Sequence, residues 1–296
     1  ADIPEGFILS RQADAWIREG QVEEVALPLY QGIMVQQFMP TARGWLSGTG
    51  LLARWDFNGF DAPSWNPQYL MGREAASSKV LTFATCKIGY REVARSTDTR
   101  SFIGSLLPEF PCGHKVPILR IAKRSPVSAA VATGLMNSLV FDWLVRERLG
   151  AAALAWYVLK ESALPRVKSP NEFARTVARL NYVATVFAPL LIRLNLTQIG
   201  RAIARTEAER CRLTVQCDAV ATAFFGLNLQ DLMSIMSACD LPKEQLTRAS
   251  ATKIVLDARG FWRIDKNKDP ELRHTVLTLV AFHDLQQKID AAGGDR

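Results

Sequence analysis

The spacing of the apolar residues changes at Ser125, and this change constrains the fold more than any other feature of the chain. Before it, short apolar runs that alternate or are β-branched are separated by turn-forming residues, a pattern typical of strands. These runs lie at residues 24–38, 78–95 and 114–122. After Ser125, apolar residues recur at helical spacing. The sequence therefore predicts an α+β fold, strand-rich at first and mainly helical afterwards.

A long helix is predicted directly after the change, over residues 126–149. Ser125 suits the N-cap position and Pro126 the first helical position, while Gly150 is suited to end the helix. Its apolar face would be formed by Val131, Leu135, Leu139 and Trp143. The following residues, 151–165, could continue as helix or turn into a strand, and propensity favours the helix.

Two domains are predicted: a mixed, strand-rich domain of residues 1–165, closed by that long helix, and a mainly helical domain of residues 166–296. The boundary rests on a stretch rich in Pro, Lys and Ser at 164–172. A chain of 296 residues with 48% hydrophobic and 22% charged residues is typical of a globular protein. Helices of the second domain are predicted at 172–195, 195–226, 228–242 and 270–291.

Several functional classes lack support in the sequence. The five cysteines include no CxxC pair and no Cys/His cluster at zinc spacing, so neither a disulfide framework nor a metal site is predicted. No apolar run reaches the roughly 18 residues of a membrane helix, and no signal peptide is recognisable. We expect a soluble, cytoplasmic protein with no membrane partner. Because the chain opens at Ala1 without methionine, it is also interpreted as a fragment of something longer.

Catalytic signatures are missing as well. The chain has no GxxxxGK[ST] loop, no GxGxxG after a strand, no HExxH and no GxSxG. Its three histidines, at positions 114, 274 and 283, form no recognisable pairing. We therefore do not expect a complete active site within this chain.

Positive charge is concentrated in one segment. The formal net charge is +7, and residues 87–124 hold 8 Lys and Arg against 3 Asp and Glu. Arginine and lysine bind phosphates, and Ser and Thr hydroxyls are common backbone anchors. The candidate DNA-binding residues are Lys87, Arg91, Arg95, Ser96, Thr97, Thr99, Arg100 and Lys115. The alternative is a solvated strand face in which Asp98 simply pairs with Arg95 or Arg100.

Two further segments could bind a ligand, and each has a simpler interpretation. The aromatic stretch at 55–72 could stack on bases, but aromatic residues in a long loop more often anchor that loop to its own core. The charged stretch at 263–274 could hold a phosphate. We interpret it instead as a loop in which Asp269 caps the last helix, with Pro270 at its first position.

Five motifs occur in an order that resembles a known family. They are LPLYQGIMVQQF, YREVARSTDTRSFIGSLLP, MNSLVFDWLVRERLGAAALAWYVLKESALP, DAVATAFFGLNLQDLMSIM and GFWRIDKNKDPELRHTVLTLVAF, at residues 27–38, 90–108, 136–165, 218–236 and 260–282. Together they are similar to the C-terminal half of large N6-adenine DNA methyltransferases. These belong to type IIG-like restriction-modification systems and to related phage-defence systems such as DISARM and BREX.

The resemblance implies a DNA-binding target-recognition module that binds double-stranded DNA and accompanies a methyltransferase catalytic domain or subunit. S-adenosylmethionine would be the cofactor of that catalytic part. Its Gly-rich and Asn-Pro-Pro-Tyr motifs do not occur here, so the resemblance implies no cofactor in this chain and no catalysis by it alone. It also implies scaffold roles for Asn137, Ser138, Phe141 and Asp142.

A second function remains open. The helices after residue 166 carry apolar faces, which favour a protein-interaction subunit of a defence complex that does not contact bases. The charge clustered at 87–124 favours DNA instead.

Overall fold

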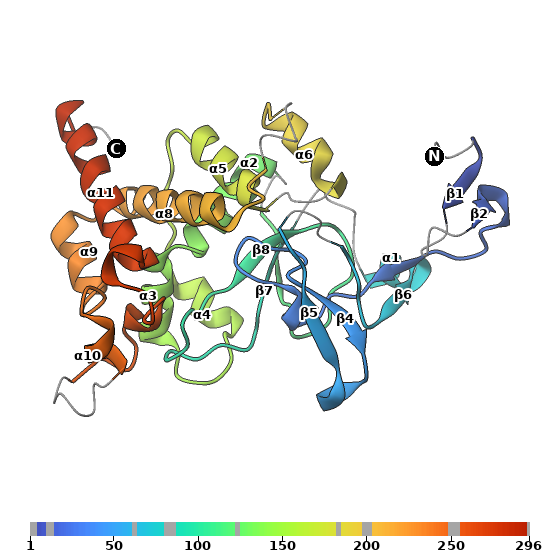
Figure 1. Ribbon diagram of the computed structural model, residues 1–296. Coiled ribbons are helices and arrows are strands. Elements are labelled where there is room, and N and C mark those ends of the chain that lie inside the picture. Colours follow the sequence, from blue (N-terminus) through green and yellow to red (C-terminus); the bar gives the residue numbers. More distant parts are fainter. Residues whose placement is uncertain are drawn as a thin grey trace.

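The computed structural model shows an α+β fold with small antiparallel sheets in the first part and helices packed in the second (Figure 1). This confirms the predicted fold class. The structure describes residues 5–9, 15–60, 64–79, 87–121, 125–181, 185–196, 203–247 and 255–294.

The described strands form four small sheets. Three are two-stranded (β1–β2, β3–β6 and β4–β5), and the fourth has the order β8–β7–β9. All of these pairings are antiparallel. The strands are β1 (Phe7–Leu9), β2 (Trp16–Arg18), β3 (Ala26–Pro28), β4 (Arg43–Ser47), β5 (Arg54–Phe57), β6 (Leu70–Gly72), β7 (Lys87–Tyr90), β8 (Gly104–Leu107) and β9 (Ile118–Leu119).

The helices α5, α8 and α11 lie together in the second part of the chain, and α2 joins them to the three-stranded sheet (Figure 1). The helices are α1 (Arg73–Lys79), α2 (Pro126–Met136), α3 (Leu139–Arg148), α4 (Trp156–Glu161), α5 (Asn171–Asn181), α6 (Ala188–Arg193), α8 (Glu207–Phe224), α9 (Leu229–Ile235), α10 (Lys243–Thr247) and α11 (His274–Ala291).

The predicted strand runs are only partly strands. The run at 24–38 contains β3 and then short turns, because a 3-10 turn (Gly32–Met34) interrupts it. In the run at 78–95, β7 is the described strand, and residues 80–86 lie outside the described residues. The run at 114–122 supplies the two residues of β9.

The predicted helix at 126–149 is two helices, α2 and α3, which meet at 65°. The Ser125 cap is confirmed, because its hydroxyl accepts from the backbone N–H of Ser128 at 3.3 Å. A second cap breaks the helix: the Ser138 hydroxyl accepts from the Phe141 N–H at 3.2 Å. Ser and Asn side chains compete for backbone groups in this way, so the prediction of one continuous helix is wrong.

The later helices are shorter than predicted. The helix expected at 228–242 ends with α9, and the expected helix at 195–226 is described as α8, with residues 197–202 outside the described residues. Before α11, Pro270 begins a separate 3-10 turn. Asp269 makes no side-chain cap there and pairs with Lys243 at 3.0 Å, which corrects its predicted capping role.

One apolar core crosses the predicted domain boundary at residue 165. It joins residues of the strand-rich part to residues of α2, α5 and α8, among them Phe38, Ile88, Leu106, Phe173, Val177 and Leu213. Polar contacts cross it too, because the Asn181 amide of α5 accepts from the Leu106 N–H at 2.8 Å and donates to the Leu106 carbonyl at 3.0 Å. The two predicted parts are therefore packed as one unit.

Among the described residues, no single helix has both the length and the apolar composition needed to cross a membrane. The bent α2–α3 pair satisfies both criteria only when its two helices are combined. Most side chains of α2 are buried inside the protein.

Candidate nucleic-acid interface

The second motif contains a turn at 95–101 that is fixed from inside the protein. Asp142, on α3, accepts from the backbone N–H groups of Ser101 at 2.9 Å and Phe102 at 3.2 Å. Asn137, at the break between α2 and α3, donates to and accepts from the Gly104 backbone, at 2.9 and 3.1 Å. The side chains of the third motif therefore hold the backbone of the second, in agreement with the scaffold roles that the resemblance implied.

Arg100 belongs to this buried junction. Its side chain is 10% exposed and donates to the Asn137 carbonyl at 2.9 Å. Its guanidinium also lies 3.6 Å from the Asp142 carboxylate and 3.9 Å from that of Asp218. Two acids thus neutralise this arginine inside the protein. This corrects the prediction that Arg100 faces DNA.

Asp218 connects the junction to the C-terminal helix. On α8, its carboxylate accepts from the Leu139 N–H at 2.8 Å and from His274 Nε2, at the start of α11, at 2.5 Å. Burial lowers the pKa of His274, but its hydrogen bonds to Asp218 and Cys211 outweigh this effect and raise it to about 8. The imidazolium form is therefore the one that this contact stabilises.

Lys87 is also internal. It lies on β7 with 2% of its surface exposed and donates to the Phe110 carbonyl at 2.5 Å. A lysine that is neither exposed nor free cannot contact a duplex. The prediction that Lys87 belongs to a DNA-facing patch is corrected accordingly.

The turn itself presents one free cation. The Asp98 carboxylate accepts from the Arg95 backbone N–H at 2.9 Å, so Asp98 stabilises the turn and pairs with neither arginine side chain. Arg95 is exposed, and its guanidinium makes no hydrogen bond or ion pair within the described part of the chain. Thr97 and Thr99 are exposed beside it, and Ser96 is half-buried.

The other two candidates line a groove of about 760 Å³ next to the β4–β5 hairpin. We call this space the basic groove. Its lining comes from segments far apart in the sequence and includes Gln31, Gln68, Tyr69, Arg91, His114 and Lys115. The structure thus brings Arg91 and Lys115 together with Asp98 of the turn, and it leaves Lys87 and Arg100 buried elsewhere.

Arg91 is half-buried in the basic groove. Its Nε donates to the Val35 carbonyl at 2.6 Å, which fixes the guanidinium in place. Burial lowers the pKa of Arg91, and the nearby cation Arg43 lowers it further. No ion pair between Arg91 and an acid occurs among the described residues. A desolvated guanidinium beside a like charge is stabilised by any anion that enters the groove.

Lys115 is exposed and partly neutralised. Its ammonium lies 2.6 Å from the Glu92 carboxylate. The backbone behind it is closely packed, because a Cβ on Gly32 would lie 3.3 Å from the Lys115 carbonyl oxygen. Exposed ion pairs of this kind are weak, so a phosphate can compete for the ammonium.

Two glutamines connect the basic groove to the hairpin. Gln31 Nε2 donates to Gln68 Oε1 at 3.1 Å, and Gln68 Nε2 donates to the Gly48 carbonyl at 3.1 Å. Sequence reasoning missed Gln31, Gln68 and His114 as groove residues. The sequence did carry signals for them: the first motif contains Gln31, the aromatic stretch at 55–72 contains Gln68, and His114 directly precedes the candidate Lys115.

The aromatic stretch at 55–72 divides between two roles. Trp65 anchors it to the core as predicted, since its indole N–H donates to the Tyr30 hydroxyl at 2.7 Å and its ring packs edge-on to Phe110. Trp55 lies within β5 and lines the basic groove, so it is not part of a loop. Tyr69 also lines the groove and is exposed.

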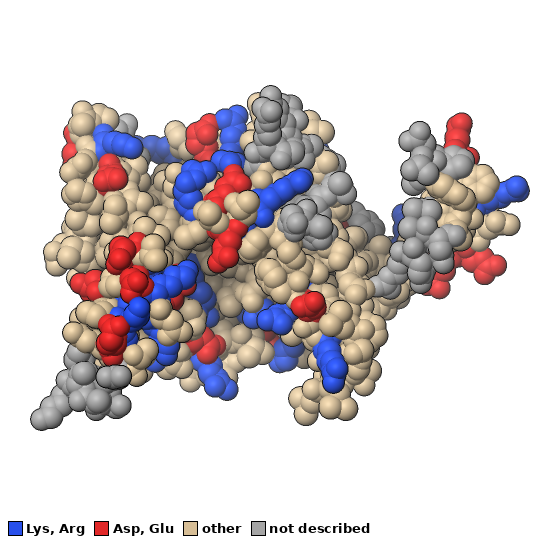
Figure 2. Space-filling model, in the orientation of Figure 1, with Lys and Arg blue, Asp and Glu red and all other residues tan. Residues whose placement is uncertain are grey.

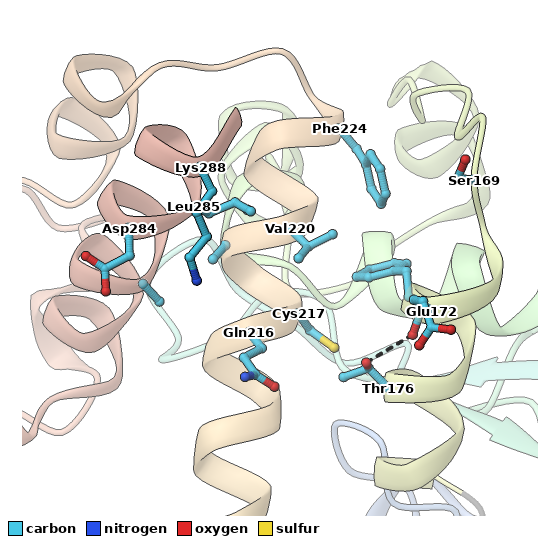
Figure 3. Close-up of a pocket in the computed structure, with 13 residues that line it drawn as sticks. Ser169, Glu172, Thr176, Gln216, Cys217, Val220, Phe224, Asp284, Leu285 and Lys288 are labelled. Carbon is cyan, nitrogen blue, oxygen red and sulfur yellow. Dashed lines mark hydrogen bonds between the residues drawn. The ribbon is translucent and has the colours of Figure 1, made fainter. Parts of the chain in front are cut away.

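A second hollow of about 440 Å³ lies between α5, α8 and α11 (Figure 3). We call it the apolar groove, after the lining residues Phe173, Val220, Phe224 and Leu285. The polar side chains drawn around it include Glu172 of α5 and Lys288 of α11 (Figure 3). The predicted DNA-binding residues are absent from its lining.

The described residues contain no group of three or more His, Cys, Asp or Glu side chains arranged to hold a metal ion. Comparison with protein-family models, with curated proteins and with solved structures finds no significant match to this chain.

Proposed function

We propose that this chain is the target-recognition module of an N6-adenine DNA methyltransferase or restriction-modification enzyme, and that it binds double-stranded DNA through the basic groove. The single observation that carries the proposal is Arg91. Its guanidinium is partly desolvated, fixed by the Val35 carbonyl and adjacent to Arg43, and it forms no ion pair with an acid among the described residues. A planar guanidinium of this kind can bind a DNA phosphate through two parallel hydrogen bonds.

Arg95 and the turn add contacts beside the groove. The exposed guanidinium of Arg95 and the hydroxyls of Thr97 and Thr99 are groups that typically hold the phosphate backbone. Because Asp98 both stabilises this turn and lines the groove, the turn and the groove can engage one duplex together. Base recognition would then fall to Gln31, Gln68 and His114, whose side chains can read base edges.

The motif order supports the same class of protein. The second, third, fourth and fifth motifs meet at the junction of Arg100, Asp142, Asp218 and His274, which positions the turn. In the proposed complex, the catalytic domain or subunit binds S-adenosylmethionine and modifies adenine. A cytoplasmic location, where such enzymes meet their DNA, is part of the proposal.

The test removes two groove cations. We expect Arg91→Gln with Lys115→Gln to weaken binding to pooled random duplexes. The slope of log affinity against log salt should fall by about 1 to 2 units, because each phosphate contact contributes about 0.9. Gel shifts or fluorescence anisotropy at several salt concentrations would measure this slope.

The matched control removes two charges from the helical face, by Arg212→Gln with Lys288→Gln. Both side chains are exposed on α8 and α11, so their loss should leave the slope unchanged. An equal fall in both double variants would mean that net charge alone binds DNA, and the basic groove would not be the site.

The apolar groove favours a second function, that of a protein-interaction subunit. Its lining is mostly apolar and is open to solvent between three helices. Such a hollow suits an apolar side chain of a partner. If the wild-type chain binds no duplex at low salt, this second function replaces the first.

A further inference from the structure

The tip of the β4–β5 hairpin presents leucines to solvent. Leu46 is 59% exposed, Leu52 82% and Leu51 fully exposed. The hairpin projects from the body of the protein (Figure 1), and its tip shows no charged atoms in the space-filling view (Figure 2). Neighbouring exposed leucines are uncommon on a surface that has no binding role.

The tip is a tight turn with a defined backbone conformation. Gly48 has a φ of 77°, and a Cβ there would lie 2.3 Å from the Leu52 carbonyl oxygen, so the chain closes on itself at this point. The Leu52 N–H donates to the Thr49 carbonyl at 3.0 Å, and the Trp45 indole donates to the Gly48 carbonyl at 2.8 Å. The backbone that carries the leucines is therefore held in one conformation, which lowers the entropic cost of binding.

The tip and the basic groove are parts of one surface. Gly50, Ala53 and Trp55 of the hairpin line the groove, and Gln68 of the groove donates to Gly48 at the tip. Arg54 adds an exposed cation on β5, directly after the tip. An apolar tip beside cations complements the chemistry of DNA, which combines apolar stacked bases with anionic phosphates.

We propose that Leu51 and Leu52 form a wedge that inserts between base pairs of DNA held in the basic groove. Leucine is one of the side chains that separate base steps in this way, and a bent duplex then contacts more protein surface. This inference rests on the proposed DNA-binding function. It names the ligand as a duplex in which two adjacent base pairs are separated. Phosphate contacts at Arg91 and Lys115 supply affinity, and the leucines supply the distortion.

A mismatch assay tests the wedge. Separating two base pairs costs free energy in a perfect duplex, but at a tandem mismatch the bases are already poorly stacked and the cost is small. The wild-type chain should therefore bind a centrally mismatched duplex about tenfold more tightly than the perfect one. Leu51→Ala with Leu52→Ala should remove this preference. The salt slope should not change, because no cation is lost.

The control is Val255→Ala with Leu272→Ala, two exposed apolar residues of the C-terminal part. It should keep the wild-type preference. Thermal melting should show both double variants folded, since all four side chains are exposed.

Two results would overturn the wedge. The first is a wild-type chain without mismatch preference, and the second is a leucine variant that retains it. In either case, a salt slope that still depends on Arg91 and Lys115 would leave the proposed function standing. Loss of all duplex binding by the wild type would instead remove both proposals.

Discussion

The contact between His274 and Asp218 makes a largely enclosed histidine part of the framework. His274 is 13% exposed at its side chain and faces Asp218, Cys211 and the more distant Arg100. Its pKa is about 8, against about 6.5 in an unfolded chain. The folded protein therefore binds this proton more tightly than the unfolded one does.

We predict that the free energy of unfolding falls as the pH rises through the pKa of His274. The stabilisation is complete below about pH 6.5 and is lost as the pH rises through about 8, because the raised pKa belongs to the folded state. A shift of this size corresponds to about 2 kcal/mol. Urea unfolding between pH 6 and pH 9 would measure it. His274→Gln should remove this step from the pH profile, and a step that persists in that variant would assign it to another group.

Charge alone could not separate the arginines of the second motif. Arg91, Arg95 and Arg100 are equally basic in the sequence, yet only Arg100 meets two buried carboxylates. Asp142 and Asp218 lie 42 and 118 positions further along the chain, so no local pattern predicts that pairing. The prediction for Lys87 was wrong for a related reason. The sequence of an apolar strand does not show that its lysine will reach a backbone carbonyl inside the protein, as Lys87 reaches that of Phe110.

At the scale of elements, the packing of α2 on α5 depends on one glycine. A Cβ on Gly134 would lie 2.6 Å from Val177 Cγ2 and 2.7 Å from the ring of Phe173. Both neighbours are buried in the shared core and would have to shift to make room for the added Cβ. The glycine sets how closely the two helices approach.

Gly134→Ala should destabilise the protein by about 1 to 3 kcal/mol through overpacking. This would outweigh the gain of about 1 kcal/mol that alanine brings to a helix interior. Chemical denaturation would measure the difference. Gly150→Ala is the control, because a Cβ there has nothing within 4 Å and should change stability little. A stabilised Gly134→Ala protein would contradict the close packing.

Sequence patterns predict some helix boundaries and miss others. The cap at Ser125 was predictable, because a Ser-Pro pair before an apolar run has a local meaning. The break at Asn137 was not, since Leu135 and Leu139 keep helical spacing across it. Besides the Ser138 cap of α3, Asn137 binds the Gly104 backbone at this break, and that partner lies 33 positions away.

At the scale of the whole molecule, the shared core contradicts a chain that folds in two independent halves. Phe38 of the first part packs in the same cluster as Leu213 of α8. Arg210 of α8 also donates to the Phe38 carbonyl at 3.3 Å. Composition had suggested a linker at 164–172, but a Pro- and Ser-rich stretch can also run over the surface of a single core.

A fragment of residues 1–165 should therefore not fold cooperatively. It would expose Ile88 and Leu106 and leave the Leu106 backbone without Asn181. We expect a broad thermal transition and dye binding typical of exposed apolar surface, against a single sharp transition for the whole chain. A sharp transition in the fragment would restore the predicted domain boundary.

The contacts of Arg146 have a consequence for the order of folding. Its guanidinium donates to the Asp98 carbonyl on one side and, at 2.6 Å, to the Arg259 carbonyl on the other, and it stacks over Phe261. Arg259 lies 113 positions after Arg146. Since a chain emerges from the ribosome N-terminus first, this side of the turn gains its support only after Arg259 and Phe261 have been synthesised. The turn at 95–101 would thus reach its final form well after its own residues have been synthesised.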